Sequence, residues 1–473
     1  MPSLAAAPLA RDADATLTAQ LAARYAERIR QRLLAPGARL PSVRECAKRH
    51  GISTYTVVAA YDQLLAQGLI EARKQRGFFV RETQPPTRSR AAANEDRPPA
   101  PVDAAALIRG MFQQPGSPLM PGFGTLPPDW LDLSMLSTAL RRVTAGERLG
   151  PLALRYGEPA GDSRLRAALA IKLDGFGLKV EASQIVTTIG ATQALDIVSR
   201  TLLQPGDAVL VDEPGWAVEF ARLGRLGQRI VPVPRGADGP DLATMRSLIA
   251  AHKPRLYATV SVLHNPTGAM LSLAAAHQVL KLAEVHDFHI VEDDTYAHLA
   301  PAHAPRLSAL DGLQRTVYVS GFSKILTPAW RVGFIAAPPA LVERCIDVKL
   351  LSTLTTPAVL EQAVALCLEQ GQLRRHAERV LQKLDAARAR SVQLALQAGM
   401  RFVSQPQGLF GWVDAGVDTD RLAALLLDEG WVLAPGSLFH ATPRPTTLMR
   451  INFATSQDAR MWRALERAKN QLV

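Results

Sequence analysis

A lysine and an arginine in the second half of the chain are the residues best placed to do chemistry together. Lys324 ends the run Ser320–Lys324, and Arg331 follows seven positions later in the run Trp330–Phe334. A lysine amine can attack a carbonyl carbon and form a Schiff base, and a guanidinium can hold a phosphate through two parallel hydrogen bonds. A lone lysine is usually a solvated surface charge. The pair therefore indicates Schiff-base chemistry only together with other groups that could bind the same ligand.

Groups that could bind a cofactor ring follow two other strand-like runs. Asp293 and Tyr296 come just after the apolar pair at 290–291, and Asn265 lies in the run His264–Gly268. A carboxylate can keep a pyridine nitrogen protonated, and amide or phenol donors can hydrogen-bond a phenolate oxygen. An Asn-Pro-x-Gly run is more often a plain turn. These residues therefore have to be weighed as a set with the lysine.

A phosphate cradle and an anion clamp complete the set. The turn Gly190–Gln193 stands between a strand-like run and a helical pattern, where free backbone N–H groups and the helix dipole favour a phosphate. Arg450, in the predicted strand 448–453, suits a bidentate contact with a carboxylate, although a lone buried arginine more often belongs to an ion pair. Schiff-base lysine, ring-nitrogen acid, phenolate donors and phosphate cradle are together what pyridoxal 5'-phosphate (PLP) requires of a protein.

The order of these motifs resembles that of the fold-type I aminotransferases, a family of PLP enzymes. The resemblance implies that Lys324 is the catalytic Schiff-base lysine, that Asp293 pairs with the ring nitrogen, and that Arg450 binds the carboxylate of a substrate or effector. It also implies a dimer, because Tyr156 resembles the tyrosine that reaches the phosphate of the neighbouring subunit. The other implied cofactor contacts are Asn265 and Tyr296 at the phenolate, Trp216 stacked on the ring, and Gly190, Ala191, Thr192, Ser323 and Arg331 at the phosphate.

Beside the lysine, the chain departs from the aminotransferase pattern. Gly321 stands three positions before Lys324, where relatives commonly carry Ser or Thr. One hydroxyl of the phosphate site is therefore expected to be missing. We expect Ser320 to compensate from a shifted position, and the cofactor to bind more weakly than in a dedicated aminotransferase.

The N-terminal part shows a helix-turn-helix pattern. Apolar residues recur at helical spacing over residues 17–33. Ser42 followed by Glu45 is a capping box that begins a second helix, and Ser53 caps a third helix after the turn Gly51–Ile52. The stretch that follows predicts two short strands around a basic tip, which would form a wing.

This pattern resembles the GntR family of winged helix-turn-helix regulators, most clearly in the runs Gly37–Arg44 and Gly77–Val80. The resemblance implies a DNA-binding domain over residues 15–81. Many relatives carry Arg or Lys where this chain has Thr54, and guanidinium to guanine is the commonest direct base contact. A small helical domain that binds proteins is the alternative. The positions implied to face DNA are Arg44, Thr54, Tyr55, Thr56, Arg76 and Gly77.

Strand-like and helical patterns alternate through the C-terminal part, which predicts an α/β fold with a mainly parallel sheet. The resemblance implies a PLP-binding domain over residues 122–473, with helices on both faces of the sheet and a small α+β subdomain from about residue 358. The prolines of residues 82–121 predict an extended linker between the two modules.

Composition agrees with a protein that binds DNA. The net charge is +11, and residues 1–100 contain 16 Lys and Arg against 9 Asp and Glu, which is typical of a phosphate-backbone binder or of a solvated basic tail. No run approaches the roughly 18 apolar residues of a membrane helix, so we expect a cytoplasmic protein. The three cysteines are widely spaced and predict neither disulfides nor a metal site.

The order of the modules resembles the MocR subfamily of bacterial regulators. This implies a transcription regulator that works as a head-to-tail homodimer, in which PLP, or an amino compound joined to it, sets how the DNA-binding modules meet an operator. Two alternatives stay open. A working aminotransferase would carry out repeated transamination, whereas a cofactor-free scaffold would lack the absorbance of a Schiff base.

Overall fold

The computed structural model describes residue 9 and residues 15–30, 33–34, 36–73, 76–81, 121–146 and 149–472. The predicted proline-rich linker, residues 82–121, lies outside these segments except for its last residue. None of the helices in this part of the chain is long and apolar enough to cross a membrane.

The N-terminal module forms helices followed by a hairpin, as the sequence predicted. Ser42 caps the second helix by accepting the Glu45 backbone N–H at 3.3 Å, and Ser53 caps the third by accepting the Thr56 N–H at 3.1 Å. Gly51 between them has a φ of 63°, a left-handed conformation that glycine adopts without a steric penalty. The elements are α1 (Leu17–Arg30), α2 (Val43–His50), α3 (Thr54–Ala66), β1 (Ile70–Arg73) and β2 (Gly77–Val80).

A mixed sheet forms the centre of the large domain, and most neighbouring strands in it run parallel. Its strand order is β3-β10-β9-β8-β7-β4-β5-β6. The prediction of a mainly parallel sheet is confirmed for the strands from β9 through β5. The strands are β3 (Ile185–Thr188), β4 (Ala208–Glu213), β5 (Arg229–Gly236), β6 (Gly239–Pro240), β7 (Leu256–Thr259), β8 (His289–Asp293), β9 (Thr316–Gly321) and β10 (Gly333–Ala336).

Strand β10 differs from this pattern, since it pairs antiparallel with both β9 and β3. Residues 322–332, which join β9 to β10, are too few for a crossover, because a parallel return needs a dozen or more residues and usually a helix. The chain therefore turns back directly. This turn carries Lys324 and Arg331, so the lysine and the arginine project from one short loop at the end of β9.

Helices cover both faces of the large sheet. On one face Val209 and Val291 pack with buried residues of α8 and α13, and on the other face their neighbours Leu210 and Ile290 pack with α10 and α11. This is the alternation expected of strands buried on both sides. The helices of this domain are α5 (Leu133–Thr144), α6 (Leu149–Ala153), α7 (Ser163–Asp174), α8 (Gly190–Leu202), α9 (Ala217–Arg225), α10 (Leu242–His252), α11 (Leu273–His286), α12 (Leu307–Asp311), α13 (Pro339–Thr353) and α14 (Ala358–Glu369).

The C-terminal part forms a second, antiparallel sheet of order β11-β12-β14-β13. This sheet begins at Arg401, whereas α14, which the sequence placed in the small subdomain, packs on α5 and α7. The elements are α15 (Gln372–Gln397), β11 (Arg401–Phe402), β12 (Phe410–Asp414), α16 (Thr419–Asp428), β13 (Ala434–Pro435), β14 (Leu448–Asn452) and α17 (Ala459–Asn470).

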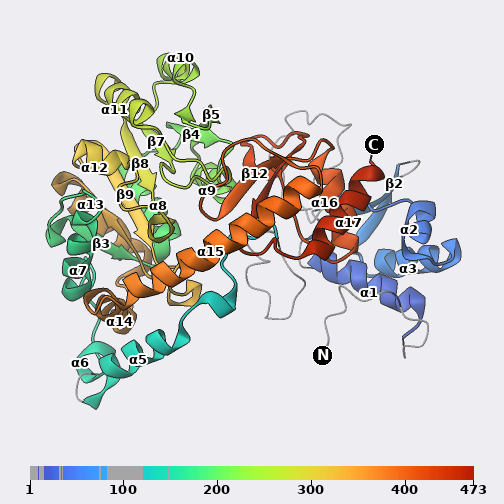
Figure 1. The fold of residues 1–473 in the computed structure, drawn as a ribbon, viewed down its shortest axis with the longest axis horizontal. Helices are drawn as coiled ribbons and strands as arrows, with labels where there is room; N and C mark the ends of the chain where they lie inside the picture. The colour runs from blue at the N-terminus through green and yellow to red at the C-terminus, as the bar shows by residue number, and fades with distance from the viewer. Residues whose placement is uncertain are drawn as a thin grey trace.

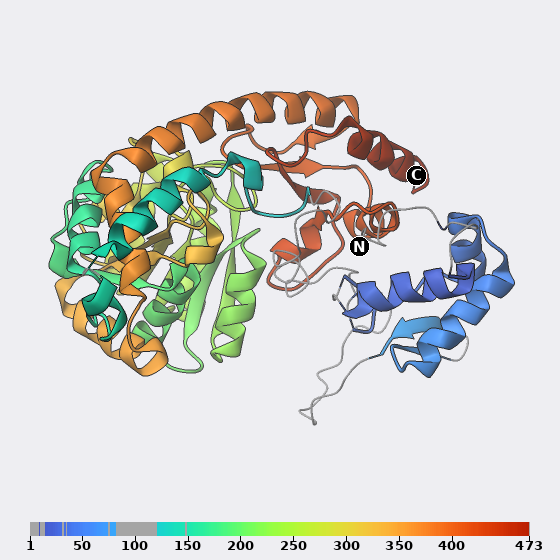
Figure 2. The same cartoon turned by 90° about the horizontal axis from the view of Figure 1, so that it is seen from below.

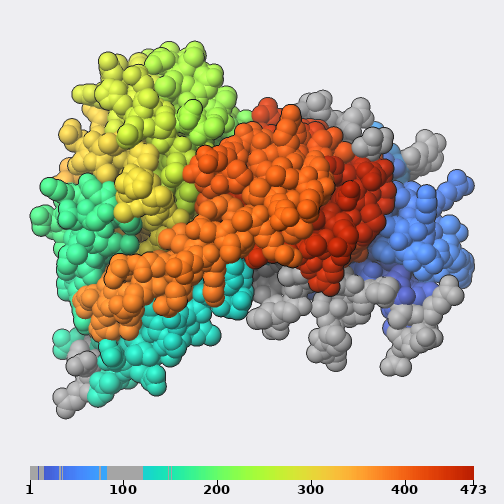
Figure 3. Space-filling view, viewed as in Figure 1, coloured from blue at the N-terminus to red at the C-terminus, as the bar shows by residue number. Residues whose placement is uncertain are grey.

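The small sheet lies between the large sheet and the N-terminal module. Figures 1 and 2 both show the red C-terminal elements next to the blue module, with the green and yellow large sheet on the other side. Helix α15 runs from the large domain along the small sheet, and the space-filling view in Figure 3 shows its orange surface spanning the two. The N-terminal module therefore meets the small domain rather than the large sheet.

Candidate functional site

Three of the predicted cofactor residues, Trp216, Asn265 and Asp293, meet at the carboxyl ends of the central strands. A pocket is lined there by Trp216 from the start of α9, Thr259 at the end of β7, Asn265 and Asp293. In parallel sheets, ligands bind outside the carboxyl ends of the strands. The structure thus brings together residues that the sequence placed in separate motifs.

Asp293 ends β8 and turns its carboxylate into this pocket. One oxygen, Oδ1, accepts hydrogen bonds from the backbone N–H of Thr295, at 3.0 Å, and from the Thr295 hydroxyl. Burial raises the pKa of Asp293 from 3.8 to about 6, because a charged carboxylate loses its hydration there. A cationic N–H donor facing Asp293 would relieve that cost, so the group fits a protonated pyridine nitrogen.

Lys324 lies in the β9–β10 loop, and its side chain reaches the segment that precedes α5. Its Nζ donates to the carbonyl oxygen of Gly124 at 2.8 Å. Burial, with a further contribution from the positive charge of Arg450, lowers the pKa of Lys324 to about 8. A lowered pKa keeps more of the amine in the neutral, nucleophilic form that Schiff-base chemistry needs.

A phosphate cradle is formed where α8 begins. Gly190 has a φ of 75°, and a Cβ placed on it would lie 2.5 Å from the guanidinium of Arg331. That guanidinium donates to the Ser323 hydroxyl at 3.1 Å and to the Ile189 carbonyl at 3.2 Å. Among the described residues no carboxylate pairs with Arg331. A half-buried cation beside the open N-terminus of a helix fits a phosphate.

The serine expected to compensate for Gly321 does not reach this cradle. The Ser320 hydroxyl donates to the backbone carbonyl of Asp294 at 2.8 Å and is buried. A Cβ on Gly321 would instead lie 3.4 Å from the backbone nitrogen of Ala191, so position 321 faces the cradle. Successive residues of a strand point to opposite faces, and the assignment of Ser320 to the cofactor is therefore wrong. Thr192 lies exposed in the first turn of α8.

Arg450 is a buried cation that contacts the pocket residue Asn265. Its two terminal nitrogens donate to Asn265 Oδ1 at 2.7 Å and to the Gly122 carbonyl at 2.6 Å, and it stacks over Phe410 and Phe439. Burial lowers its pKa to about 10, and no carboxylate among the described residues forms an ion pair with it. The ion-pair alternative is thus not favoured. An isolated buried guanidinium fits an incoming carboxylate.

Asn265 lines the pocket and also contacts Arg450. Because its Oδ1 accepts from Arg450, its amide nitrogen remains the group that can donate to a phenolate. Tyr296, buried against Phe410, lies between the same elements. The arrangement can therefore hold a ring between Trp216 and the amide, with a carboxylate on the far side.

Sequence reasoning missed a buried network beneath the pocket. The carboxylate of Asp212 accepts hydrogen bonds from Tyr257, Thr259 and Arg235, at 2.6, 2.7 and 2.9 Å, respectively, and lies 3.6 Å from His264. The network fixes the ends of β4, β5 and β7, from which the pocket residues project. Its members lie on different strands, so no local motif could have revealed it.

Tyr156 lies exposed on the segment that precedes α7. Its side chain is 82% exposed, and the segment that carries it passes close to the large sheet at Gly161. A Cβ on Gly161 would lie 1.7 Å from the Thr187 hydroxyl, and this glycine has a φ of 101°. Only glycine permits so close an approach. The tyrosine is therefore presented outward from an anchored loop.

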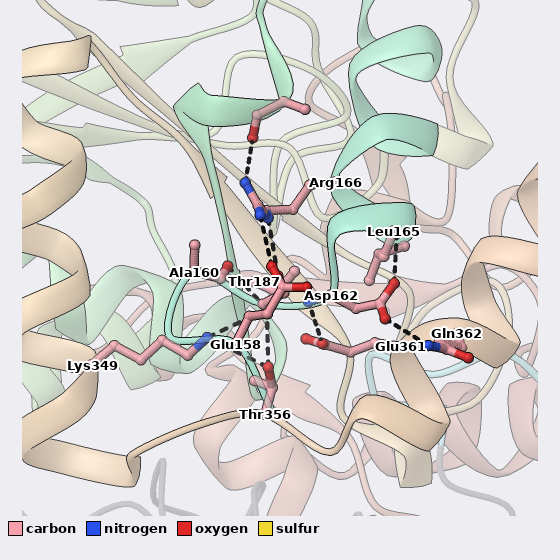
Figure 4. Close-up of polar contacts among 12 residues, drawn as sticks. Glu158, Ala160, Asp162, Leu165, Arg166, Thr187, Lys349, Thr356, Glu361 and Gln362 are labelled. Carbon is pink, nitrogen blue, oxygen red and sulfur yellow. Dashed lines mark hydrogen bonds and ion pairs between the residues drawn. The ribbon is translucent and has the colours of Figure 1, made fainter. Parts of the chain in front are cut away.

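Buried polar side chains hold this loop in place, as Figure 4 shows. The Asp162 backbone N–H donates to Glu361 at 2.8 Å, while Lys349 lies 3.4 Å from the hydroxyls of Thr187 and Thr356. Lys349 is fully buried, and burial lowers its pKa to about 8. These contacts tie the loop to α13 and α14.

The residues implied to face DNA lie on α2, at the start of α3 and in the wing. Arg44, Thr54, Tyr55 and Arg76 are exposed, and Tyr55 is 81% exposed although it is a large aromatic residue. Thr56 is half-buried because its hydroxyl lies 2.8 Å from that of the capping Ser53. Gly77 is exposed with a φ of 99° at the wing tip. Thr54, Tyr55 and Thr56 lie in the first turn of α3, where the positive end of the helix dipole favours phosphate.

The fold and the site together define an aminotransferase-type domain joined to a winged helix-turn-helix module. A family model for aminotransferase class I and II matches residues 132–467, and a model for bacterial regulatory proteins of the gntR family matches residues 17–80. The chain therefore belongs to the aminotransferase class I and II family and, through its N-terminal module, to the MocR subfamily of GntR-type transcriptional regulators.

Several known proteins are similar over most of the chain. The probable rhizopine catabolism regulatory protein MocR of Rhizobium meliloti is 30% identical over 79% of this chain and 76% of its own length. The HTH-type transcriptional regulator TauR of Rhodobacter capsulatus is 29% identical over 85% of both chains. The α-aminoadipate aminotransferase LysN of Thermus thermophilus, solved with N-(5'-phosphopyridoxyl)-L-leucine, superimposes with a TM-score of 0.69 and 26% identity over 75% of this chain and 92% of that chain.

Proposed function

We propose that this regulator binds PLP through Lys324 and senses an amino compound that carries a carboxylate. The observation that carries the proposal is Arg450, a buried guanidinium without an acidic partner among the described residues, which donates to Asn265 at the edge of the pocket that Asp293 lines. When bound, the cofactor supplies an aldehyde carbon for the lysine amine and a ring that withdraws electrons. The carboxylate of the effector would be held by Arg450.

Each residue has a distinct part in this proposal. Lys324 holds the cofactor covalently, Asp293 keeps the ring nitrogen protonated, and Arg331 holds the phosphate with Ser323. Asn265 donates to the phenolate while its Oδ1 orients Arg450. The position of Gly321 lacks a phosphate hydroxyl, so the protein would bind PLP less tightly than an enzyme that has one.

The partners of the proposed regulator are operator DNA and a second copy of the chain. Thr54, Tyr55 and Arg76 are exposed on the elements that would meet the duplex. A dimer is supported by the exposed Tyr156 and by exposed apolar side chains close to its loop. Since DNA is the partner, we place the protein in the cytoplasm.

A working aminotransferase is the second candidate function. It is favoured by the proximity of Lys324, Asp293 and Arg450, since the charges of Asp293 and Arg450 both act on Lys324, and by the likeness to LysN. Repeated turnover of an amino acid and a keto acid would support it. A single conversion of the bound cofactor without turnover would support the regulator.

The test is cofactor binding by the wild-type protein and the Lys324→Ala variant. We expect the wild type to acquire the yellow absorbance of a Schiff base, and sodium borohydride to fix the cofactor to the chain as a stable mass increase. Lys324→Ala should lose both. Lys172→Ala is the matched control, because burial likewise lowers the pKa of Lys172 to about 8. A covalent adduct that persists in Lys324→Ala would refute the lysine assignment.

A second binding experiment, with two stable ligands, tests the carboxylate site. N-(5'-phosphopyridoxyl)-glycine carries a carboxylate, whereas pyridoxamine 5'-phosphate lacks one. Arg450→Ala should bind the pyridoxamine form as the wild type does, yet lose most of the preference for the glycine adduct. An undiminished preference would show that the effector carboxylate is held elsewhere.

A further inference from the structure

A short segment before α5, residues 121–126, lies between the proposed effector site and the DNA-binding module; we call it the connector. Its backbone carbonyls are held by residues of that site: Arg450 donates to the Gly122 carbonyl at 2.6 Å and Lys324 to the Gly124 carbonyl at 2.8 Å. Asn452 donates to the carbonyls of Phe123 and Thr125, at 2.7 and 2.8 Å, respectively. Two of these three side chains, those of Arg450 and Lys324, are also the ones that would hold ligands.

The connector also lies tightly against the small domain. The Gly122 N–H donates to the Val432 carbonyl at 2.9 Å, and a Cβ on Gly122 would lie 2.5 Å from the backbone of Leu433. No side chain fits between these backbones. A shift of Gly122 would therefore also displace the segment after α16.

The side chain of Phe123 points away from the effector site, toward the DNA-binding module. It is only 6% exposed and belongs to one hydrophobic cluster with Leu427 and Val432 of the small domain and with buried residues of α1 and α3, including Leu21 and Tyr61. The residues on either side of Phe123, Gly122 and Gly124, are held through their carbonyls by Arg450 and Lys324, and the side chain of Phe123 joins the core of the module.

An ion-pair cluster at the end of α16 secures the same contact. The carboxylate of Asp428 accepts hydrogen bonds from Arg28 of α1 and from Arg49 of α2. Arg28 also donates to the Leu427 carbonyl at 2.8 Å. The side chains of Arg28 and Asp428 are 5% and 9% exposed. Separating a buried ion pair is costly because each charge then lacks its partner. Small shifts at this contact therefore have a large energetic consequence.

We propose that the connector transmits effector binding to the DNA-binding module. The inference rests on the proposed function and deepens it. A carboxylate that takes both terminal nitrogens of Arg450 competes with the Gly122 carbonyl, and a charged acceptor is the stronger partner. Release of the Gly122 carbonyl moves the neighbouring Phe123 and changes how the module packs on α16.

Two features follow from this arrangement. Coupling between sites is reciprocal, so operator DNA that favours one seating of the module also changes the affinity of the site for the carboxylate. The carboxylate, rather than the cofactor alone, supplies the larger part of the signal, because only the carboxylate competes for Arg450.

The test measures hydrogen–deuterium exchange and operator affinity of the full-length protein with two ligands. With pyridoxamine 5'-phosphate as the reference, N-(5'-phosphopyridoxyl)-glycine should speed exchange in residues 121–126 and at the module contact. It should also change the operator Kd by roughly 5- to 150-fold, the usual range of coupling between two sites. The operator is a duplex selected in vitro with the wild-type protein.

Variants separate the connector from general effects on folding. Phe123→Ala should bind the glycine adduct but lose most of the change in operator Kd, and Phe123→Leu should retain much of it. Phe402→Ala is the matched control, since Phe402 packs in the small domain outside this cluster. It should leave the coupling intact.

The outcomes distinguish this inference from the function on which it rests. If Phe123→Ala responds to the adduct as strongly as the wild type does, the connector is not the link, although the proposed function stands. If the adduct binds but exchange in residues 121–126 is unchanged, the inference also fails. If neither ligand binds the wild type, the proposed function fails and the inference with it.

Discussion

At the residue scale, the buried carboxyl group of Asp293 lowers the stability of the cofactor-free protein. Burial raises its pKa from 3.8 to about 6, so the folded protein holds this proton at pH values where the unfolded chain has lost it. By linkage, the stability that the group contributes is fully present below pH 3.8 and is lost as the pH rises through about 6. At neutral pH the folded protein therefore bears the cost of a buried carboxylate until a cation faces it.

We expect Asp293→Asn to stabilise the cofactor-free protein at pH 7 by at most about 3 kcal/mol, the equivalent of a shift of about two pKa units. The gain should vanish below pH 4, where the wild-type carboxyl group is protonated in both states. Urea unfolding at several pH values measures it. Asp238→Asn, at an exposed acid, should change stability little at any pH. A gain that did not depend on pH would contradict the burial argument, whereas weaker PLP binding by Asp293→Asn would agree with the proposed role.

The residues that sequence could identify are those whose side chains recur in a motif. Lys324, Asp293 and Arg450 were found in this way, and in the structure the charges of Asp293 and Arg450 both act on Lys324. Ser320 was misassigned because a strand turns alternate residues to opposite faces. The connector could not be found, because its contacts come from the backbone carbonyls of Gly122 and Gly124, which every sequence possesses.

At the scale of elements, helix α3 presents the DNA-facing residues and depends on its N-terminal cap. Ser53 accepts the Thr56 N–H, and Thr54 and Tyr55 lie in the turn that this bond fixes. Local order of that turn and contact with DNA are therefore linked.

Ser53→Ala should cost about 1 kcal/mol of stability and weaken operator binding about fivefold, since the frayed turn must be ordered again on the duplex. Chemical denaturation and a binding titration measure the two effects. Ser272→Ala removes the equivalent cap of α11, where Ser272 accepts the Ala275 N–H at 3.2 Å. It should lose similar stability without any change in DNA affinity. Equal losses of affinity in both variants would show that the effect is one of global stability.

Elements with strong local signals were predicted well, and those set by packing were not. The caps at Ser42 and Ser53 and the β-branched strands lie where the patterns placed them. Strand β10 runs antiparallel to its neighbours, but its apolar sequence, Gly333–Ala336, does not indicate that direction. Helix α14 has the composition of any amphipathic helix, and only its contacts with α5 and α7 place it.

At the scale of the whole molecule, exposed apolar side chains gather near the loop that carries Tyr156. Leu154, Leu351 and Leu354 are 84%, 91% and 51% exposed. The two segments lie together, because a Cβ on Gly157 would be 3.1 Å from the Thr356 carbonyl. Exposed apolar patches of this kind mark interaction surfaces. A second copy of the chain is the partner that the outward Tyr156 favours.

Leu351→Asp should therefore convert the protein to a monomer, because a charge would be buried without a partner in the proposed interface. Light scattering after size exclusion measures the mass. Operator affinity should fall by roughly 100-fold or more, since linking two modules raises their effective concentration. The dependence of log Kd on log salt should become about half as steep, because half of the phosphate contacts are lost.

Leu273→Asp, at a leucine that is 65% exposed on α11, should remain a dimer and bind as the wild type does. A fragment of residues 1–85 should bind as weakly as the Leu351→Asp monomer. A monomer that bound the operator as tightly as the wild type would show that one module is sufficient for recognition and that the exposed leucines serve another contact.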